Sequence, residues 1–128
     1  MASQDRRQTV LLVDDSVETA KALALLLEQS GFAVITAHDG REALRRAREA
    51  RPAIALLDLS LPVVDGFGVA ESLRKGPGGD DLLLVAISGH GLPDDCARTR
   101  AVGFDHHFVK PIDCAELLAC LSVYKTPV

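Results

Sequence analysis

Short apolar runs recur along the chain, and most of them end at a polar residue. Four such runs lie at residues 10–13, 32–37, 54–57 and 82–87, and a shorter, less apolar one follows at 106–109. Runs that are this short and this apolar are typical of strands buried on both faces of a parallel sheet. The pattern therefore predicts five strands with polar side chains at their ends.

Between these runs the apolar residues recur at helical spacing. The spacing predicts helices at about 16–30, 40–51, 67–75, 93–102 and 114–121. Capping-box pairs and helix-ending glycines support these boundaries, at Asp39 with Glu42, Asp113 with Glu116, Gly31 and Gly103. Strand and helix thus alternate five times. The alternation predicts one α/β domain, a doubly wound, five-stranded parallel sheet flanked by five helices.

The composition fits a single cytoplasmic domain. The chain has 128 residues, of which 48% are hydrophobic, and its formal net charge is −4. This charge disfavours direct nucleic-acid binding, and no apolar run approaches the ~20 residues of a membrane span. The three cysteines, Cys96, Cys114 and Cys120, lack metal-motif spacing and indicate reduced thiols. We expect the folded domain at 9–124, between tails at 1–8 and 125–128.

Polar side chains that can carry chemistry follow four of the predicted strands. They are Asp14 and Asp15, Asp58, Ser88 and Lys110. Because the carboxyl ends of parallel strands lie at one edge of the sheet, we expect these side chains to meet there. Three carboxylates in one place repel one another and favour a cation, for which Mg²⁺ is the default among oxygen ligands. The residues therefore predict phosphoryl chemistry with Asp58 as a candidate nucleophile.

Each of these residues also has a purely structural interpretation. Asp14 and Asp15 can cap the first helix, and Asp58 can simply terminate a strand. Ser88 can be a turn residue, and Lys110 can be a solvated strand end. The metal and phosphoryl interpretations are favoured because acids, hydroxyl and amine all fall at corresponding ends of buried strands.

The motifs at these strand ends resemble those of the receiver domains of two-component response regulators. Within residues 9–121 the matching segments are Val13-Asp14-Asp15, Leu57-Asp58-Leu59 with Pro62 and Asp65-Gly66, Ile87-Ser88-Gly89, and Val109-Lys110-Pro111. The resemblance implies a flavodoxin-like fold with strand order 2-1-3-4-5. It also implies that Asp58 accepts a phosphoryl group from a phosphohistidine. Mg²⁺ would be held by Asp58 and by Asp14, Asp15 and the backbone carbonyl of Ser60, and Ser88 and Lys110 would contact the phosphoryl oxygens.

One position departs from this family. His107 stands three residues before Lys110, where the family usually has Tyr or Phe as a rotameric switch. The imidazole can fill the space that opens when Ser88 moves toward the phosphoryl group, or it can be a surface residue, and the sequence leaves both interpretations open. By the same resemblance, Ser60 and His90 flank the phosphoryl group and tune the lifetime of the phosphorylated state.

The resemblance implies a signalling switch that acts on itself, not a turnover enzyme. Its expected partners are a histidine kinase or histidine phosphotransfer protein and a downstream protein target. A homodimer through the fourth helix, fifth strand and fifth helix is a further expectation. The sequence leaves open whether the chain stands alone or is cut from a longer protein such as a hybrid sensor kinase.

Three rival functions are less well matched by the residues. A Mg²⁺-dependent aspartyl-phosphate phosphatase carries a second Asp where this chain has Ser60. A flavin carrier of the same fold needs a Ser/Thr/Gly-rich phosphate loop where this chain has Asp14 and Asp15. A pseudo-receiver that only binds partners would not need the complete set of phosphorylation residues.

Overall fold

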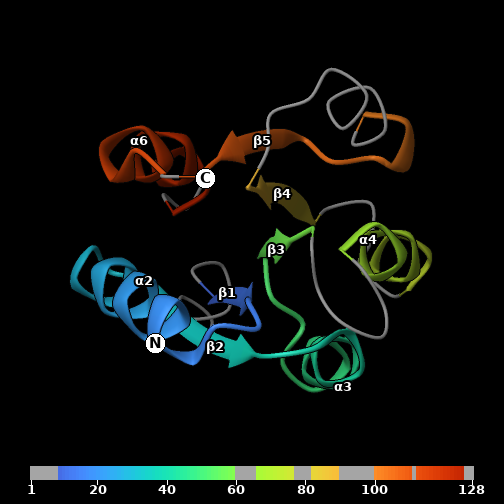
Figure 1. Cartoon of the computed structure of the whole chain (residues 1–128). Helices are drawn as coiled ribbons and strands as arrows, with labels where there is room; N and C mark the ends of the chain where they lie inside the picture. The colour runs from blue at the N-terminus through green and yellow to red at the C-terminus, as the bar shows by residue number, and fades with distance from the viewer. Residues whose placement is uncertain (1–8, 60–65, 77–81, 90–99, 111, 126–128) are drawn as a thin grey trace.

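A five-stranded parallel sheet forms the centre of the protein in the computed structural model (Figure 1), which describes residues 9–59, 66–76, 82–89, 100–110 and 112–125. The strands follow the order β2-β1-β3-β4-β5, and every neighbouring pair is parallel. Their bounds are β1 Thr9–Val13, β2 Ala33–Ala37, β3 Ile54–Asp58, β4 Leu83–Ser88 and β5 His106–Val109. The predicted strand order 2-1-3-4-5 is confirmed.

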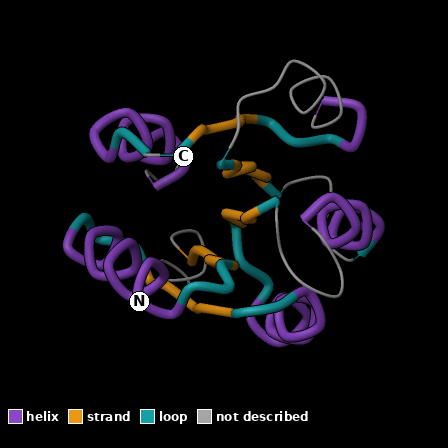
Figure 2. The backbone as a smooth tube through the Cα atoms, in the orientation of Figure 1, coloured by secondary structure: helices purple, strands orange, loops and turns teal. Residues whose placement is uncertain are grey.

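Helices cover both faces of this sheet. The helices with described bounds are α2 Val17–Gln29, α3 Gly40–Ala50, α4 Gly66–Lys75 and α6 Cys114–Lys125. Helices α2 and α6 lie on one face, and α3 and α4 lie on the other (Figures 1 and 2). Of the helix expected at 93–102, residues 100–102 are helical and the rest lies outside the described residues. Helix α6 continues to Lys125, one residue past the predicted end of the domain.

The central strands are buried on both faces because their side chains alternate between two apolar layers. Leu11 and Leu57 pack with residues of α3 and α4, whereas Leu12 and Leu56 pack with residues of α2 and α6. Every residue of β1, β3 and β4 is buried. This double burial explains the unbroken apolar runs, and it fixes the positions of the polar residues that follow them.

The ends of the helices largely follow the sequence signals. Asp39 caps α3 by accepting a hydrogen bond from the Glu42 N–H at 2.8 Å. In a capping box the Glu42 side chain would accept from the N–H of Asp39. Here it accepts from the N–H of His38, one residue earlier. Arg51, in the left-handed conformation with φ of 47°, ends α3 just before the proline expected to close it.

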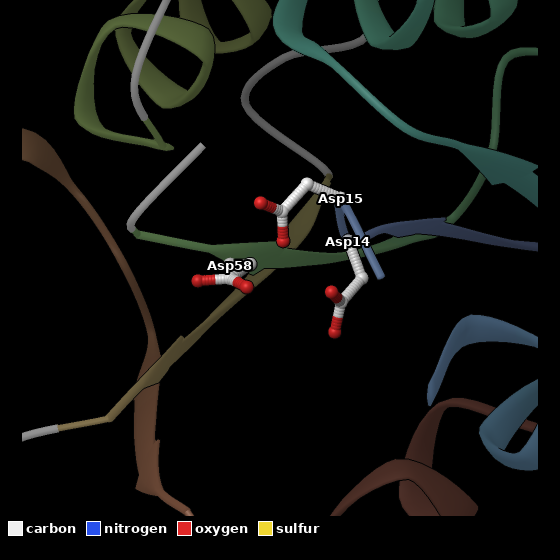
Figure 3. A group of neighbouring side chains, drawn as sticks. All are labelled: Asp14, Asp15 and Asp58. Carbon is white, nitrogen blue, oxygen red and sulfur yellow. The ribbon is translucent and has the colours of Figure 1, made fainter. Parts of the chain in front are cut away.

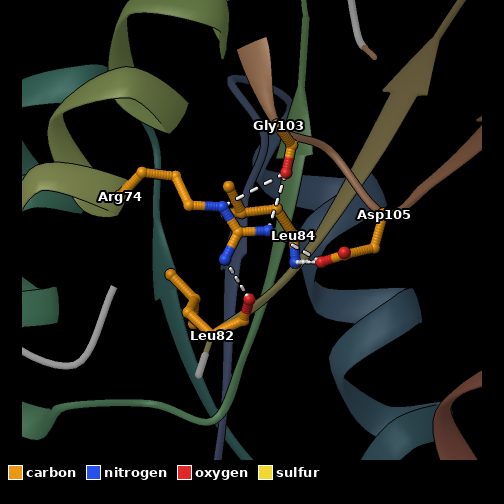
Figure 4. Close-up of polar contacts among 5 residues, drawn as sticks. All are labelled: Arg74, Leu82, Leu84, Gly103 and Asp105. Carbon is orange, nitrogen blue, oxygen red and sulfur yellow. Dashed lines mark hydrogen bonds and ion pairs between the residues drawn. The ribbon is translucent and has the colours of Figure 1, made fainter. Parts of the chain in front are cut away.

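Arg74 ties α4 to the start of β4 and to the segment that leads into β5 (Figure 4). Its guanidinium donates to the carbonyl oxygens of Leu82 and Gly103 and pairs with Asp105 at 2.8 Å. The same Asp105 carboxylate accepts from the N–H of Leu84 at 2.9 Å. Gly103 has a φ of 109°, and a Cβ there would lie 3.3 Å from Arg74 Nε. This network anchors the beginning of the edge strand β5.

We predict that Arg74→Lys lowers the stability of the domain. An ammonium cannot reproduce the planar fork, so carbonyl groups of the network lose their donors at a cost of ~1–3 kcal/mol. Urea unfolding followed by circular dichroism measures this loss, with Arg48→Lys on the exposed side of α3 as the matched control. Equal unfolding midpoints for the two variants would contradict the anchoring role.

Candidate functional site

The predicted acidic residues meet at the carboxyl edge of the sheet (Figure 3). Asp14 directly follows β1, and Asp58 is the last residue of the neighbouring strand β3. Both side chains are buried, with Asp14 4% and Asp58 1% exposed, whereas Asp15 is exposed. One carboxylate oxygen from each of the three lies within 4.8 Å of the others. The three acids thus form a compact cluster that is open to solvent on the side of Asp15.

Asp14 is held in place by its own loop, and its surroundings disfavour the ionised form of its carboxyl group. Its Oδ1 accepts a hydrogen bond from the N–H of Ser16 at 2.9 Å. Burial raises the pKa of Asp14, and the neighbouring carboxylates of Asp58 and Asp15 raise it further. The hydrogen bond from Ser16 and the charge of Lys110 oppose this rise without cancelling it. Burial thus disfavours the ionised form of Asp14, and the contacts within the protein compensate for this only in part.

Lys110 brings a positive charge to the cluster from the end of β5. Its Nζ lies 3.2 Å from Asp58 Oδ2 and 3.8 Å from Asp14 Oδ2. Burial alone would lower the pKa of Lys110, but the charges of the three carboxylates and the hydrogen bond to Asp58 outweigh it, so the pKa is raised. Lys110 is therefore an ammonium group that faces the Asp58 carboxylate.

Ser88 and His107 lie in direct contact at the same edge. Ser88 is 5% exposed at the end of β4, and its Oγ is 2.7 Å from Nε2 of His107 on β5. The sequence alone is compatible with His107 as a surface residue or as a switch residue. In the structure its side chain is half-buried and contacts Ser88, which is predicted to bind the phosphoryl group.

His38 is a residue of this edge that the sequence reasoning missed. It follows β2 as Asp14 follows β1, so the same position after a strand could have identified it. Its Nδ1 lies 3.1 Å from the carbonyl oxygen of Asp14. Since a carbonyl oxygen only accepts, Nδ1 is the donor, and the ring supports the backbone of the acidic loop. Two predicted lifetime-tuning residues, Ser60 and His90, lie outside the described residues, as does Pro111.

The acidic cluster fits a hard divalent cation. Mg²⁺ prefers carboxylate oxygens and usually retains several waters, which suits two buried carboxylates beside an exposed one. Lys110 supplies one positive charge against three carboxylates, and burial keeps the pKa of Asp14 raised, so a cation at this site would stabilise the ionised carboxylate. Asp14, Asp15 and Asp58 are the residues that would hold the ion.

Comparison with known proteins identifies the family. The family model described as the response regulator receiver domain matches residues 10–122, and the chain belongs to this family. The transcriptional regulatory protein PrrA of Mycobacterium leprae is 41% identical over 110 residues, which cover 86% of this chain and 46% of that protein. The chain thus spans about half the length of this relative. An uncharacterized 14.6 kDa protein of Leptolyngbya boryana is 30% identical over 115 residues, 90% of this chain and 88% of that protein.

Solved structures share the same fold. The chemotaxis protein CheY4 of Vibrio cholerae superposes with a TM-score of 0.85 at 31% identity, covering 91% of this chain and 97% of that one. CheY in a CheX-CheY-BeF3-Mg complex of Borrelia burgdorferi gives a TM-score of 0.82 at 31% identity, covering 91% and 88%. The flavodoxin-like receiver fold expected from the sequence is confirmed. None of the helices in the described ranges could span a membrane.

We predict that Asp14→Asn stabilises the metal-free protein at neutral pH. The folded-state pKa of Asp14 is raised, so ionisation destabilises the fold once the pH exceeds the pKa of the unfolded chain. The amide removes that charge and keeps an oxygen for the Ser16 N–H. We expect a melting temperature a few degrees higher in EDTA, since ~1 kcal/mol corresponds to roughly 2–8 °C in domains of similar size.

The gain should shrink toward acidic pH, where the native carboxyl is protonated. Asp113→Asn is the matched control, because this exposed residue caps α6 through the N–H of Glu116 and Asn caps equally well. If the variant melts at or below the native temperature at neutral pH, ionisation of the buried Asp14 does not destabilise the fold.

Proposed function

We propose that this receiver domain is a phosphorylation switch in which Asp58 takes a phosphoryl group from the phosphohistidine of a histidine kinase or histidine phosphotransfer protein. The observation that carries this proposal is the buried Asp58 carboxylate, with Lys110 Nζ at 3.2 Å and two further acids beside it. Membership of the receiver family gives independent support.

The chemistry follows from the side chains at the edge of the sheet. An oxygen of Asp58 attacks the phosphorus, the new P–O bond forms as the P–N bond to the donor imidazole breaks, and that imidazole leaves and takes up a proton from solvent. Lys110 offsets charge on the phosphoryl oxygens, and Ser88 donates its hydroxyl proton to one of them. Asp14, Asp15 and Asp58 would hold Mg²⁺, whose charge would offset that of the acids and of the phosphoryl oxygens.

A groove beside the site supports docking of the phosphodonor protein. This cavity of about 480 Å³ lies between α2 and α6, and its walls are formed by Glu18, Thr19, Ala22, Leu23, Leu26, Ile112, Cys114 and Lys110. Most of these side chains are apolar, whereas Lys110 also faces Asp58. A partner helix seated in this groove would bring a phosphohistidine close to the acceptor carboxylate.

The exposed edge of the sheet supports an output surface. Strand β5 is an edge strand, and Val109 on it is 42% exposed although it is apolar. Phosphorylation would alter the surface formed by the helix expected at 93–102, β5 and α6, where a downstream protein or a second copy of the chain would bind. Ser60 and His90 would set the lifetime of the phosphorylated state. The domain acts on itself and turns over no foreign substrate.

The test of this proposal is labelling by a small phosphodonor. In acetyl phosphate and Mg²⁺ the native chain should gain one phosphoryl group by intact-protein mass spectrometry, and EDTA should prevent it. Asp58→Asn should not be labelled, whereas the Asp113→Asn control should behave as the native chain. Labelling of Asp58→Asn at the native rate would overturn the assignment of the acceptor, and an unlabelled native chain would favour a pseudo-receiver.

A further inference from the structure

The contact between Ser88 and His107 is formed by two neighbouring strands in register. Ala86 lies opposite His107, and Ser88 lies opposite Val109, so the side chains of Ser88 and His107 project from the same face. Ser88 Oγ and His107 Nε2 are 2.7 Å apart, a short distance for a hydrogen bond involving nitrogen. The hydroxyl that is expected to bind the phosphoryl group is therefore already engaged by an imidazole.

The hydrogen-bonding capacities of the groups restrict what Ser88 can do. A hydroxyl has one proton, a phosphoryl oxygen only accepts, and an imidazole nitrogen either donates or accepts. If Ser88 donates to Nε2, its proton is not available to a phosphoryl oxygen. Ser88 can serve the phosphoryl group after this bond breaks, or after the ring reverses its role and becomes the donor.

We infer that His107 is a positioning residue that competes with the phosphoryl group for the hydroxyl proton of Ser88. The inference rests on the proposed function. In the unphosphorylated state the Ser88–His107 bond holds the hydroxyl toward β5. Phosphorylation turns the hydroxyl toward a phosphoryl oxygen, and the imidazole loses the hydrogen bond that Ser88 donates to it. Phosphorylation of Asp58 thus changes the hydrogen bonding of a side chain on β5.

A response to Ser88 has to come from side chains, because the backbone of β5 is hydrogen-bonded at both of its ends. The backbone of β5 is held at its start, where the Asp105 N–H donates to Leu84 O at 2.8 Å and the Asp105 carboxylate pairs with Arg74. It is held at its end, where the Lys110 N–H donates to Ser88 O at 2.8 Å. Rotation or tautomer change of a half-buried imidazole requires no rearrangement of these bonds.

The competition is tested by binding of beryllofluoride, a phosphoryl mimic, in Mg²⁺. His107→Phe keeps a ring but cannot hydrogen-bond to Ser88, so we expect its dissociation constant to fall by ~3–10-fold, the range for a single hydrogen bond. His107→Gln places an amide where it can replace Nε2, and this conservative variant should restore an affinity near the native value. Titration calorimetry measures the three constants.

A double-mutant cycle separates competition from packing. When Ser88→Ala has removed the hydroxyl, His107→Phe should no longer tighten binding. Mg²⁺ affinity and unfolding midpoints of the variants provide the check on folding and on the metal site.

Two results would overturn the inference alone: a native-like or weaker affinity for His107→Phe, or the same tightening in the Ser88→Ala background. A native chain that does not bind beryllofluoride at all would overturn the proposed function, and this inference with it.

Discussion

Three carboxylates share one edge of the sheet, and the two that belong to adjacent central strands are buried there. The cost of keeping these buried carboxylates ionised determines what the other residues of the site have to supply. Lys110 and the N–H of Ser16 offset part of it, yet the pKa of Asp14 is still raised by its burial. On the proposed function, a bound cation would neutralise the acids, and it would offset, together with Lys110, the negative charge that a phosphoryl group brings to Asp58.

The fold makes this arrangement unavoidable once the strands pair in parallel. Every residue of strands β1, β3 and β4 is buried, so the interior of the sheet has no room for solvated polar side chains. The polar residues of these strands therefore lie at the strand ends. The opposite edge carries the structural network of Arg74 and Asp105, which fixes where β5 begins. Chemistry and anchoring are thus separated along the strands, with Ser88 and Lys110 at one end and Arg74 at the other.

The sequence predicts the elements better than the contacts between them. Runs such as 54–57 are apolar enough to identify a doubly buried strand, so Asp58 could be placed at its end in advance. The Ser88–His107 bond could not be predicted, because it depends on the relative register of β4 and β5, which no local pattern encodes. The same holds for Arg74 and Asp105, which are far apart in the chain. His38 is hard to single out from the sequence, because a lone histidine after an edge strand resembles a surface residue.

The most direct test of the account is a crystal structure of the chain with Mg²⁺ and beryllofluoride. We expect one ion at about 2.0–2.1 Å from carboxylate oxygens of the acidic cluster, and a beryllofluoride adduct on Asp58 that contacts Lys110 and Ser88. An adduct on another residue, or an ion bound away from Asp14, Asp15 and Asp58 with Lys110 turned from the adduct, would contradict the account.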